Sequence, residues 1–322
     1  MKSLLFSLFL LTSFPLLASD GGFLFVTFKG EQTQMSEQIY FALSQDGRHW
    51  NALNGGNPVL ISTLGEKGVR DSYLLRSHDG KKFYIIATDL SINLNHDWGR
   101  SVRAGSKSIV IWDSTDLVHW SAPRLVKVAA DDAGCTWAPE AIYDDETHDY
   151  LVFWASENKS DNFTKQRIWA ARTTDFITFS KPFIYIDKPQ HVIDTDIVRE
   201  NGHYYRFSKD EKNKAITMEV SDKLMGPWSD VPGFSLATMT GYEGPECYQI
   251  EAAVGAKPAT WCLILDCYSK GTGYHPFVTS DLSKGQFIPG TDFTFPFHFR
   301  HGSILPLSRD EYQRLQGAFG GK

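Results

Sequence analysis

The chain has 322 residues, a formal net charge of −6 at pH 7 and an aromatic content of 14%. No basic cluster accompanies the modest negative charge, which argues against a nucleic-acid-binding surface. A length of about 300 residues exceeds the usual size of one domain, although all-β barrels and propellers commonly form a single unit of this size. Abundant aromatic residues suit sugar binding, because sugar rings pack on flat apolar rings, but aromatic residues also fill β cores.

The first 19 residues have the layout of a secretory signal peptide. Lys2 precedes the apolar run from Leu4 to Leu11, and the small residues Ala18 and Ser19 stand where cleavage would occur. The run is short for a membrane span, and an uncleaved anchor is the alternative. We therefore expect an exported protein, periplasmic or extracellular, with no membrane contact after cleavage. Residues 1–19 are the expected signal peptide, and 20–322 a single catalytic domain.

Four cysteines allow three disulfide pairings, and their spacing fits no zinc site: Cys135, Cys247, Cys262 and Cys267. Cys247 and Cys262 fall on what we expect to be neighbouring strands of one hairpin. Two states are compatible with the sequence: a disulfide between these two cysteines, or free buried thiols.

Five segments share one pattern, in which polar, mostly ionisable residues stand directly before a short apolar run. They begin at Arg70, Pro139, Asp194, Glu243 and Arg300. A second marker, a turn of the Ser/Thr-x-Asp type, also recurs and closes on an aromatic residue, at Trp50, Trp120, Phe179, Trp228 and Phe287. Between these markers lie alternating strand-like runs. This spacing is typical of propeller blades rather than of solenoid turns.

The repeat predicts an all-β, five-bladed β-propeller. The chain begins with the strand-like runs Phe23 to Phe28 and Gln38 to Leu43, which have no inner strand of their own, and it ends with an inner strand from Arg300 to Leu307. Pairing of these N-terminal outer strands with the C-terminal inner strand would complete the fifth blade and remove an open sheet edge. Near the C-terminus, the segment from Arg309 to Leu315 is the one expected amphipathic helix.

The first strand of every blade lines the central channel of a propeller, so equivalent positions on these strands meet at one mouth. We expect such equivalence for Asp71, Glu140, Asp194, Glu243 and the pair Arg300-His301. A turn aspartate or a strand-start glutamate is the ordinary explanation for any one of these residues. Four carboxylates and a cationic pair around one axis are costly to hold together, so the set predicts a functional site.

At these positions the sequence resembles glycoside hydrolase family 43, a family of inverting arabinofuranosidases, xylosidases and related enzymes on five-bladed propellers. The matching strings occur in the family's order: Gly68-Val69-Arg70-Asp71, Trp137-Ala138-Pro139-Glu140, Ile193-Asp194-Thr195-Asp196-Ile197, Glu243-Gly244-Pro245 and Arg300-His301-Gly302-Ser303. Each string alone has little specificity. Together, in order, they cover nearly the whole expected mature chain.

The resemblance implies three catalytic roles. Asp71 would be the general base that activates water, Glu243 the general acid, and Asp194 the carboxylate that orients the acid and raises its pKa. The chemistry needs one carboxyl that holds its proton while another stays ionised. An inverting pair also needs roughly 6.5 to 9.5 Å between its carboxyl groups to admit water.

Two departures from the family pattern bear on these roles. Ser72 replaces the proline that usually follows the base, which loosens the turn that aims Asp71. Glu140 stands where the family often has aspartate, and we expect it to be a sugar contact in the pocket. Asp196 is a rival for the modulator role because it shares a strand face with Asp194. Glu246 is a weaker rival of Glu243.

Other residues are expected around the pocket. Trp137 is the candidate for stacking on the sugar, with core packing as the alternative. Asp89 is a candidate sugar contact, although a turn role is the simpler interpretation. Arg300 and His301 are expected to point to opposite sides of a strand, one into the pocket. No cofactor is required for the chemistry. The resemblance implies a structural Ca²⁺ in the channel, and His301 would contact its waters because calcium prefers oxygen ligands.

Three hypotheses follow for the function. The first is an exported, exo-acting inverting α-L-arabinofuranosidase on plant polysaccharide side chains or oligosaccharides, with β-xylosidase or β-galactofuranosidase as alternatives, and the segment Ser91 to Lys107 as a wall of the cleft. The second hypothesis, a retaining propeller enzyme that cleaves fructans, is weaker, because the segment 20–69 lacks the motif that would carry the nucleophilic aspartate of such an enzyme. The third is a propeller that binds glycans without cleaving them, against which the three retained carboxylates argue.

Overall fold

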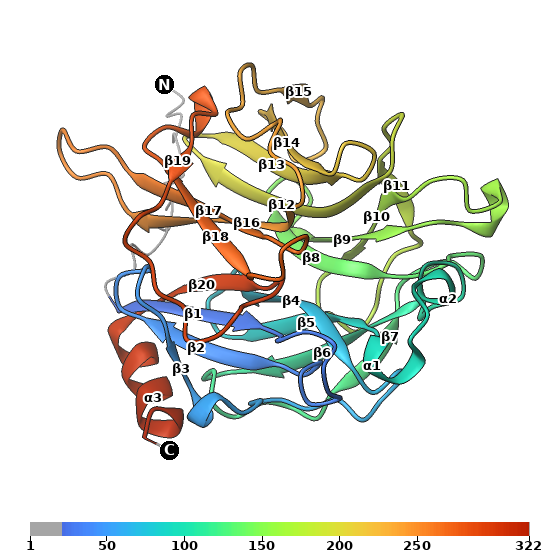
Figure 1. The fold of residues 1–322 in the computed structure, drawn as a ribbon, viewed down its shortest axis with the longest axis horizontal. Coiled ribbons are helices and arrows are strands. Elements are labelled where there is room, and N and C mark those ends of the chain that lie inside the picture. The colour runs from blue at the N-terminus through green and yellow to red at the C-terminus, as the bar shows by residue number, and fades with distance from the viewer. Residues whose placement is uncertain (1–20, 322) are drawn as a thin grey trace, which may run out of the picture.

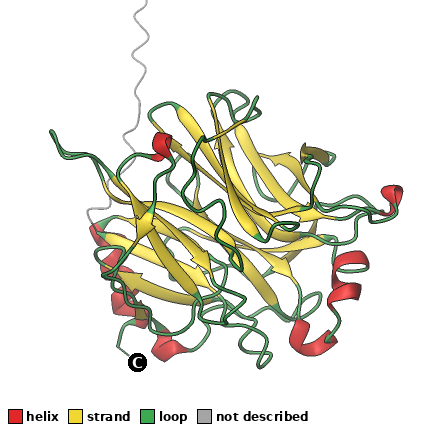
Figure 2. Ribbon diagram, turned by 45° about the horizontal axis from the view of Figure 1, so that its top comes forward, coloured by secondary structure: helices red, strands yellow, loops and turns green. Residues whose placement is uncertain are grey.

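The computed structural model describes residues 21–321, so the expected signal peptide at 1–19 lies outside the described residues. Five antiparallel four-stranded sheets surround one axis, with the first strand of each sheet nearest the centre (Figure 1). The predicted five-bladed propeller is confirmed. Figure 2 shows the same strand-dominated body, with helices restricted to its edges.

The blade that closes the ring combines the two ends of the described chain. Its strands, from the axis outward, are β20 (Ser303–Leu307), β1 (Gly22–Thr27), β2 (Tyr40–Ser44) and β3 (Asn51–Ala52). β1 and β20 pair antiparallel, with Phe25 opposite Ile304. The predicted closure by N-terminal outer strands and a C-terminal inner strand is therefore confirmed.

The other four blades follow in chain order, each written from the axis outward. The second contains β4 (Val69–Arg76), β5 (Phe83–Asp89), β6 (Ser108–Ser114) and β7 (Arg124–Lys127). The third contains β8 (Trp137–Asp144), β9 (Asp149–Ser156), β10 (Arg167–Thr173) and β11 (Phe183–Ile186). The fourth contains β12 (Val192–Glu200), β13 (His203–Asp210), β14 (Ala215–Ser221) and β15 (Ser229–Asp230). The fifth contains β16 (Glu243–Glu251), β17 (Thr260–Asp266), β18 (Tyr274–Thr279) and β19 (Ile288–Pro289).

The recurring Ser/Thr-x-Asp turns hold the outer connections of the blades. Asp46, Asp116 and Asp175 each accept hydrogen bonds from two backbone N–H groups of their own turn. Such side-chain acceptors replace the backbone partners that a turn leaves open. The sequence marker therefore identified a structural device of the fold.

The apolar core lies between neighbouring blades. One cluster joins Leu24 and Phe41 of the closing blade to Ile85 and Trp112 of the next, and comparable clusters occupy the other blade interfaces. Because apolar side chains fill these interfaces, the inner strands can carry polar side chains toward the axis.

Within residues 21–321, three α-helices lie at the edges. α1 (Ile92–Asn95) and α2 (Trp98–Arg103) lie in the connection between β5 and β6. α3 (Arg309–Phe319) follows β20, carries a capping box between Ser308 and Glu311, and extends the predicted amphipathic segment by one turn. Within residues 21–321, no helix has both the length and the apolar character that a membrane crossing needs.

All four cysteines are buried free thiols. Cys262 lies opposite Tyr248 in the β16–β17 hairpin, and Cys247 lies opposite Leu263. The two cysteines thus sit on adjacent strands, as expected, one step out of register, and the free-thiol alternative is the one that the structure adopts.

Candidate active site

The inner strands share a backbone irregularity at the mouth of the channel. In β4, β8, β12 and β16 the pairing with the second strand shifts register near the strand start. A residue with positive φ stands at each shift: Asp71 (49°), Ala138 (47°), Asp194 (48°) and Gly244 (53°). Bulges of this kind turn side chains away from the strand's regular alternation.

The shared bulge corrects the predicted alignment of the four carboxylates. Asp71 and Asp194 are equivalent, but Glu140 follows the bulge position of its strand by two residues and Glu243 precedes its own by one. The expected equivalence of all four is wrong, because the sequence pattern does not reveal where the extra residue of each strand falls. Glu140 therefore lies deeper in the channel than Asp71, Asp194 and Glu243.

Asp71, Asp194 and His301 come together in the outer layer. Oδ2 of Asp71 accepts a hydrogen bond from Thr88 Oγ1 at 3.1 Å, and Oδ2 of Asp194 accepts one from the backbone N–H of Gly244 at 3.0 Å. His301 Nδ1 lies 3.6 Å from Asp71 Oδ1 and 4.0 Å from Asp194 Oδ1. One imidazole therefore faces two carboxylates from two different blades.

Glu243 is held by a separate cation at each carboxylate oxygen. Lys209 Nζ donates to Oε2 at 2.9 Å, and Arg300 Nη2 donates to Oε1 at 3.1 Å. Burial alone would raise the pKa of Glu243, but the charge and hydrogen bond of Lys209, followed by the charge of Arg300, outweigh it and lower the pKa. In the free protein Glu243 is therefore an ionised, doubly paired carboxylate.

Asp194 has the opposite tendency. Burial and the neighbouring charge of Glu243 raise its pKa to about 6, against the lowering charge of His301. The outer layer thus contains carboxyl groups whose pKa values are driven apart by their surroundings.

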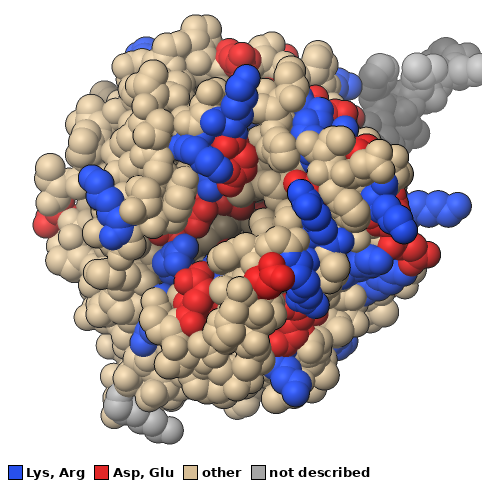
Figure 3. All heavy atoms as spheres, turned by 45° about the vertical axis from the view of Figure 1, so that its right-hand side comes forward, with Lys and Arg blue, Asp and Glu red and all other residues tan. Residues whose placement is uncertain are grey.

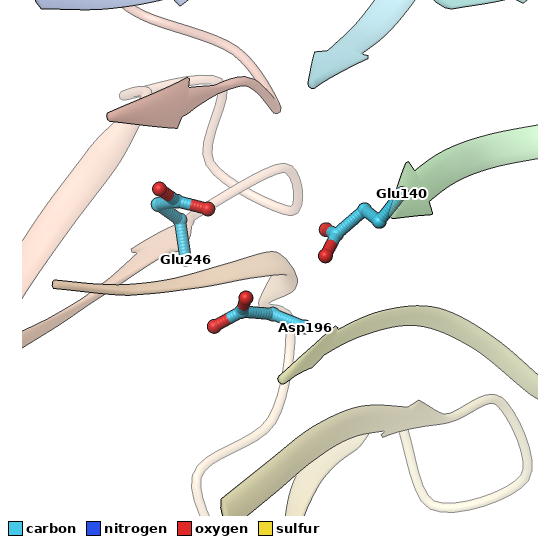
Figure 4. A group of neighbouring side chains, drawn as sticks. All are labelled: Glu140, Asp196 and Glu246. Atoms are coloured by element: carbon cyan, nitrogen blue, oxygen red, sulfur yellow. The ribbon is translucent and has the colours of Figure 1, made fainter. Parts of the chain in front are cut away.

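A second, deeper layer consists of Glu140, Asp196 and Glu246, whose carboxylates point toward one another (Figure 4). All three residues are buried, and one oxygen of each lies within 4.8 Å of the others. Burial raises the pKa of Asp196 to about 7, and burial together with repulsion from neighbouring carboxylates holds the pKa values of Glu140 and Glu246 well above the ordinary range. Among residues 21–321, the basic side chain within 4 Å of these carboxylates is His301, whose Nε2 is 3.9 Å from Glu140 Oε1.

Part of this inner layer joins neighbouring blades. Asp196 accepts a hydrogen bond from the backbone N–H of Cys247 at 2.8 Å, and Glu246 accepts one from that of Ile304 at 2.6 Å. Glu140 makes no comparable bond, and its Oε2 is buried without a hydrogen-bond partner among the described residues. Asp196 and Glu246 therefore help to join neighbouring blades, as Asp194 also does through the N–H of Gly244.

The three carboxylates of the inner layer are more suitable ligands for a hard cation than the imidazole of His301 is. Ca²⁺ takes oxygen ligands at about 2.3 to 2.6 Å, so two ligands of one ion lie at most about 5 Å apart. The three carboxylates meet that limit, and Oε2 of Glu140 is a free acceptor. His301 borders the same space without being needed as a ligand.

Several predicted pocket residues take other places. Glu140 was expected to contact sugar in the pocket, but it lies in the buried inner layer, with 3% of its surface exposed. Arg300 and His301 were expected to point to opposite sides, yet both face the channel, toward Glu243 and Asp71. That expectation is wrong because residues 300–302 precede β20 and do not have strand conformation. Asp89 is buried and accepts a hydrogen bond from the backbone N–H of Glu66, so it holds a loop.

The predicted wall and the predicted stacking residue lie together. Trp98, at the start of α2, packs edge to face on Trp137 with 6.0 Å between ring centroids. Trp98 remains 49% exposed, and the guanidinium of Arg70 lies 5.2 Å from its ring centre. Since Arg70 precedes Asp71, the two indoles stand next to the outer layer of carboxylates. The segment from Ser91 to Lys107 thus borders the site.

Lys209 and Asp266 belong to the site but were missed from the sequence. Asp266 anchors Arg300 through Nε at 2.6 Å. Both residues stand near the ends of second strands, beside the first residues of inner strands. A charged residue at or near the end of a second strand, as in Thr88-Asp89 and Ser208-Lys209, was the available signal.

The site opens on one face of the molecule. Figure 3 shows a hollow there, with acidic atoms on its walls and Lys and Arg side chains around its edge. A polar hollow of this kind can bind a neutral polyhydroxyl ligand, orient it with charged groups and move protons between carboxyl groups. Five blades around an axis, with three acidic side chains and a histidine at one mouth, are the architecture of a glycoside hydrolase propeller.

Comparison with known proteins agrees with this assignment to a class of glycoside hydrolases. Residues 20–313 match the family described as "Probable glycosyl hydrolase domain", which is related to glycoside hydrolase family 43. The chain belongs to this glycoside hydrolase family. It is 29% identical over 311 residues to an α-L-arabinofuranosidase from Bifidobacterium longum subsp. longum, with 83% of this chain and 29% of that protein covered. The chain therefore spans less than a third of that relative.

Solved structures show the same fold at low sequence identity. An exo-β-1,3-galactanase from Clostridium thermocellum matches with a TM-score of 0.59 and 11% identity, over 89% of this chain and 63% of that one. An endo-1,4-β-xylanase from Bacteroides thetaiotaomicron matches with a TM-score of 0.55 and 15% identity, over 87% and 92% of the two chains.

Proposed function

We propose that this chain is an exported inverting glycosidase that releases terminal α-L-arabinofuranosyl residues from plant polysaccharide side chains or oligosaccharides. Membership of the family supports the reaction class, and the resemblance to an arabinofuranosidase supports the sugar. Export rests on the sequence of the first 19 residues alone.

The observation that carries the proposal is the convergence of Asp71, Asp194 and Glu243, from three different inner strands, on one channel mouth. Asp71 is the proposed base, because it lies at the channel mouth, accepts a hydrogen bond from Thr88 and stands beside His301. Ionised Asp71 takes a proton from water as that water attacks the anomeric carbon. Glu243 is the proposed acid that protonates the leaving oxygen. Asp194, fixed by the N–H of Gly244, is the proposed modulator that orients the acid and raises its pKa.

Exo action is supported by the segment that carries α1 and α2. It borders the site with Trp98 against Trp137, and Arg100 at its surface forms an ion pair with Glu66. A segment held in this way limits the length of glycan that can pass, which favours removal of terminal residues.

Hydrolysis of 4-nitrophenyl glycosides tests the proposal, with α-L-arabinofuranoside, β-D-xyloside and β-D-galactofuranoside compared. Glu243→Gln should lose about 10²- to 10⁴-fold on a natural oligosaccharide but less on an aryl glycoside, because a good leaving group needs less protonation. Asp71→Asn should lose activity equally on both. Activity on the xyloside or galactofuranoside alone would change the sugar assignment, and oligosaccharide binding without hydrolysis would show a binding module.

We also propose a structural Ca²⁺ held by the inner layer of Glu140, Asp196 and Glu246. When bound, the ion would neutralise carboxylates that otherwise repel one another. The thermal midpoint of the purified chain should rise with Ca²⁺ after chelation, because a ligand that binds the folded state stabilises it. Glu140→Gln should abolish that rise, whereas Asp222→Asn, a control whose side chain is 83% exposed, should keep it. An unchanged midpoint in the wild type would mean that the three carboxyl groups share protons instead.

A further inference from the structure

Lys209 is a buried cation for which the proposed mechanism gives no role. It extends from β13 with 3% of its side chain exposed. Its Nζ lies 2.9 Å from Glu243 Oε2 and also 2.9 Å from Glu211 Oε1, and it stands 4.2 Å from the ring centre of Tyr268. One ammonium thus has two carboxylate partners, of which one is the proposed acid.

Both oxygens of Glu243 accept hydrogen bonds from side chains that can only donate. Lysine and arginine have no acceptor atom, so both bind the ionised carboxylate; a proton can still add to a second lone pair of either oxygen, but the two adjacent positive charges oppose it. The free protein is therefore arranged for a carboxylate at Glu243, whereas a general acid must carry a proton when the glycosidic bond breaks. Withdrawal of one of the two cations would remove part of this opposition at the moment when the acid must carry its proton.

Lys209 is the one of the two that can move. Arg300 is fixed by its Nε bond to the fully buried Asp266 at 2.6 Å, and a guanidinium is a rigid fork. Lysine is a point charge on a flexible stem, and Glu211 already accepts from Lys209. If Lys209 moves away from Glu243, its ammonium group therefore still has Glu211 as a partner.

We propose that Lys209 is a movable counter-ion and a positioning residue: it pairs with Glu243 in the free protein and moves fully to Glu211 when bound sugar occupies the space beside Glu243. Glu243 then takes a proton from solvent, while Lys209 keeps its own proton and charge. This inference rests on the proposed function, since it takes Glu243 as the acid. The other charged groups around Glu243 are Asp194, Asp266, Arg300 and His301, and none of them is changed in the test.

The titration of Glu243 in the free protein gives a readout that does not need activity. It can be followed by ¹³C NMR of glutamate side-chain carboxyl groups, with the signal assigned by its loss in Glu243→Gln. Lys209→Met, which keeps the length and removes the charge, should raise the pKa of Glu243 by about one unit or more. Lys209→Arg, the matched control, keeps the charge and should leave the pKa low.

The pH profiles of hydrolysis test the movement itself. The alkaline limb of kcat/KM reports the acid in the free protein, and that of kcat reports it in the complex. In the wild type the kcat limb should lie at higher pH than the kcat/KM limb, and Lys209→Met should bring the two together. Glu211→Gln, which removes the second partner, should lower kcat more than kcat/KM.

The outcomes separate the two proposals. A lower thermal midpoint in Lys209→Met with an unchanged titration of Glu243 would make Lys209 merely structural and overturn the inference. Coincident kcat and kcat/KM limbs in the wild type would also overturn it. A wild-type protein that hydrolyses none of the glycosides, but whose Glu243 titration shifts in Lys209→Met, would overturn the proposed function and leave the charge control of Glu243 standing.

Discussion

Gly244 and His301 pack so closely that a Cβ atom on residue 244 would lie 2.6 Å from Cγ of His301. Gly244 also has a φ of 53°, and its N–H donates to Asp194. A side chain there must displace the imidazole that faces Asp71 and Asp194. This glycine therefore sets the place of the histidine in the outer layer.

Gly244→Ala should destabilise the fold by about 1 to 3 kcal/mol and reduce hydrolysis, because strain at positive φ adds to the clash with His301. Gly255→Ala is the matched control, since Gly255 has a φ of 59° and a Cβ atom on it would meet nothing within 4 Å. Urea unfolding of both variants separates the backbone strain at positive φ, which both share, from the clash with His301, which only Gly244→Ala has. Equal losses of stability would mean that the contact with His301 contributes nothing.

The junction between α3 and the second blade should weaken in acid. Burial alone would raise the pKa of Glu311, but hydrogen bonds from Arg76 and from the backbone N–H of Ser308, with the charge of Arg76, hold it below the ordinary value of 4.5. A lowered pKa stabilises the fold above the unfolded-state pKa, and the stabilisation is lost as the pH falls through the lower, folded-state pKa.

Glu311→Gln should therefore cost about 1 to 2 kcal/mol at pH 7. The difference from the wild type should shrink below about pH 4.3, where an ordinary glutamate protonates. Urea unfolding at pH 7 and pH 3 measures both values. A difference that stays constant with pH would show that the carboxylate charge is not what joins α3 to Arg76.

Trp98 should contribute to substrate affinity more than to stability. It is half exposed beside Trp137, so truncation removes little buried area. Trp98→Ala should raise KM about tenfold, the equivalent of about 1.4 kcal/mol, with little change in kcat. Ile177→Ala is the control, because Ile177 is another exposed apolar residue and belongs to an outer turn. A loss of kcat without a change in KM would place Trp98 outside the sugar contact.

The four cysteines should be unreactive in the native state. Burial raises the pKa of Cys135 and of Cys262 to about 12, and the thiolate is the reactive form. A thiol reagent should therefore label four cysteines after unfolding and none before, and dithiothreitol should leave the thermal midpoint unchanged. Fewer than four labelled thiols in the unfolded, unreduced protein would reveal a disulfide.

The sequence predicted the architecture because each blade repeats the same local signals. The Ser/Thr-x-Asp turns and the polar starts of the inner strands mark the blades one by one, and the unpaired ends of the chain predict how the ring closes. These features depend on short segments, which a sequence displays directly. All of them appear in the structure, including the pairing of Phe25 with Ile304.

The depth of each carboxylate could not be predicted in the same way. It depends on the bulge at Asp71, Ala138, Asp194 and Gly244, which adds one residue to each inner strand. Glu140, which was aligned with Asp71 and Asp194, lies two positions past the bulge of its strand and therefore belongs to the inner layer. Lys209 was missed because its role depends on a contact with Glu243, 34 positions away along the chain.

The stereochemical course of hydrolysis tests the central claim most directly. ¹H NMR during cleavage of an α-L-arabinofuranoside should show β-L-arabinofuranose as the first product, because water activated by Asp71 attacks the face opposite the leaving group. The Asp71→Asn variant should form no product under the same conditions. The α anomer as first product, or full activity of Asp71→Asn, would contradict the assignment of Asp71 as the base of an inverting enzyme.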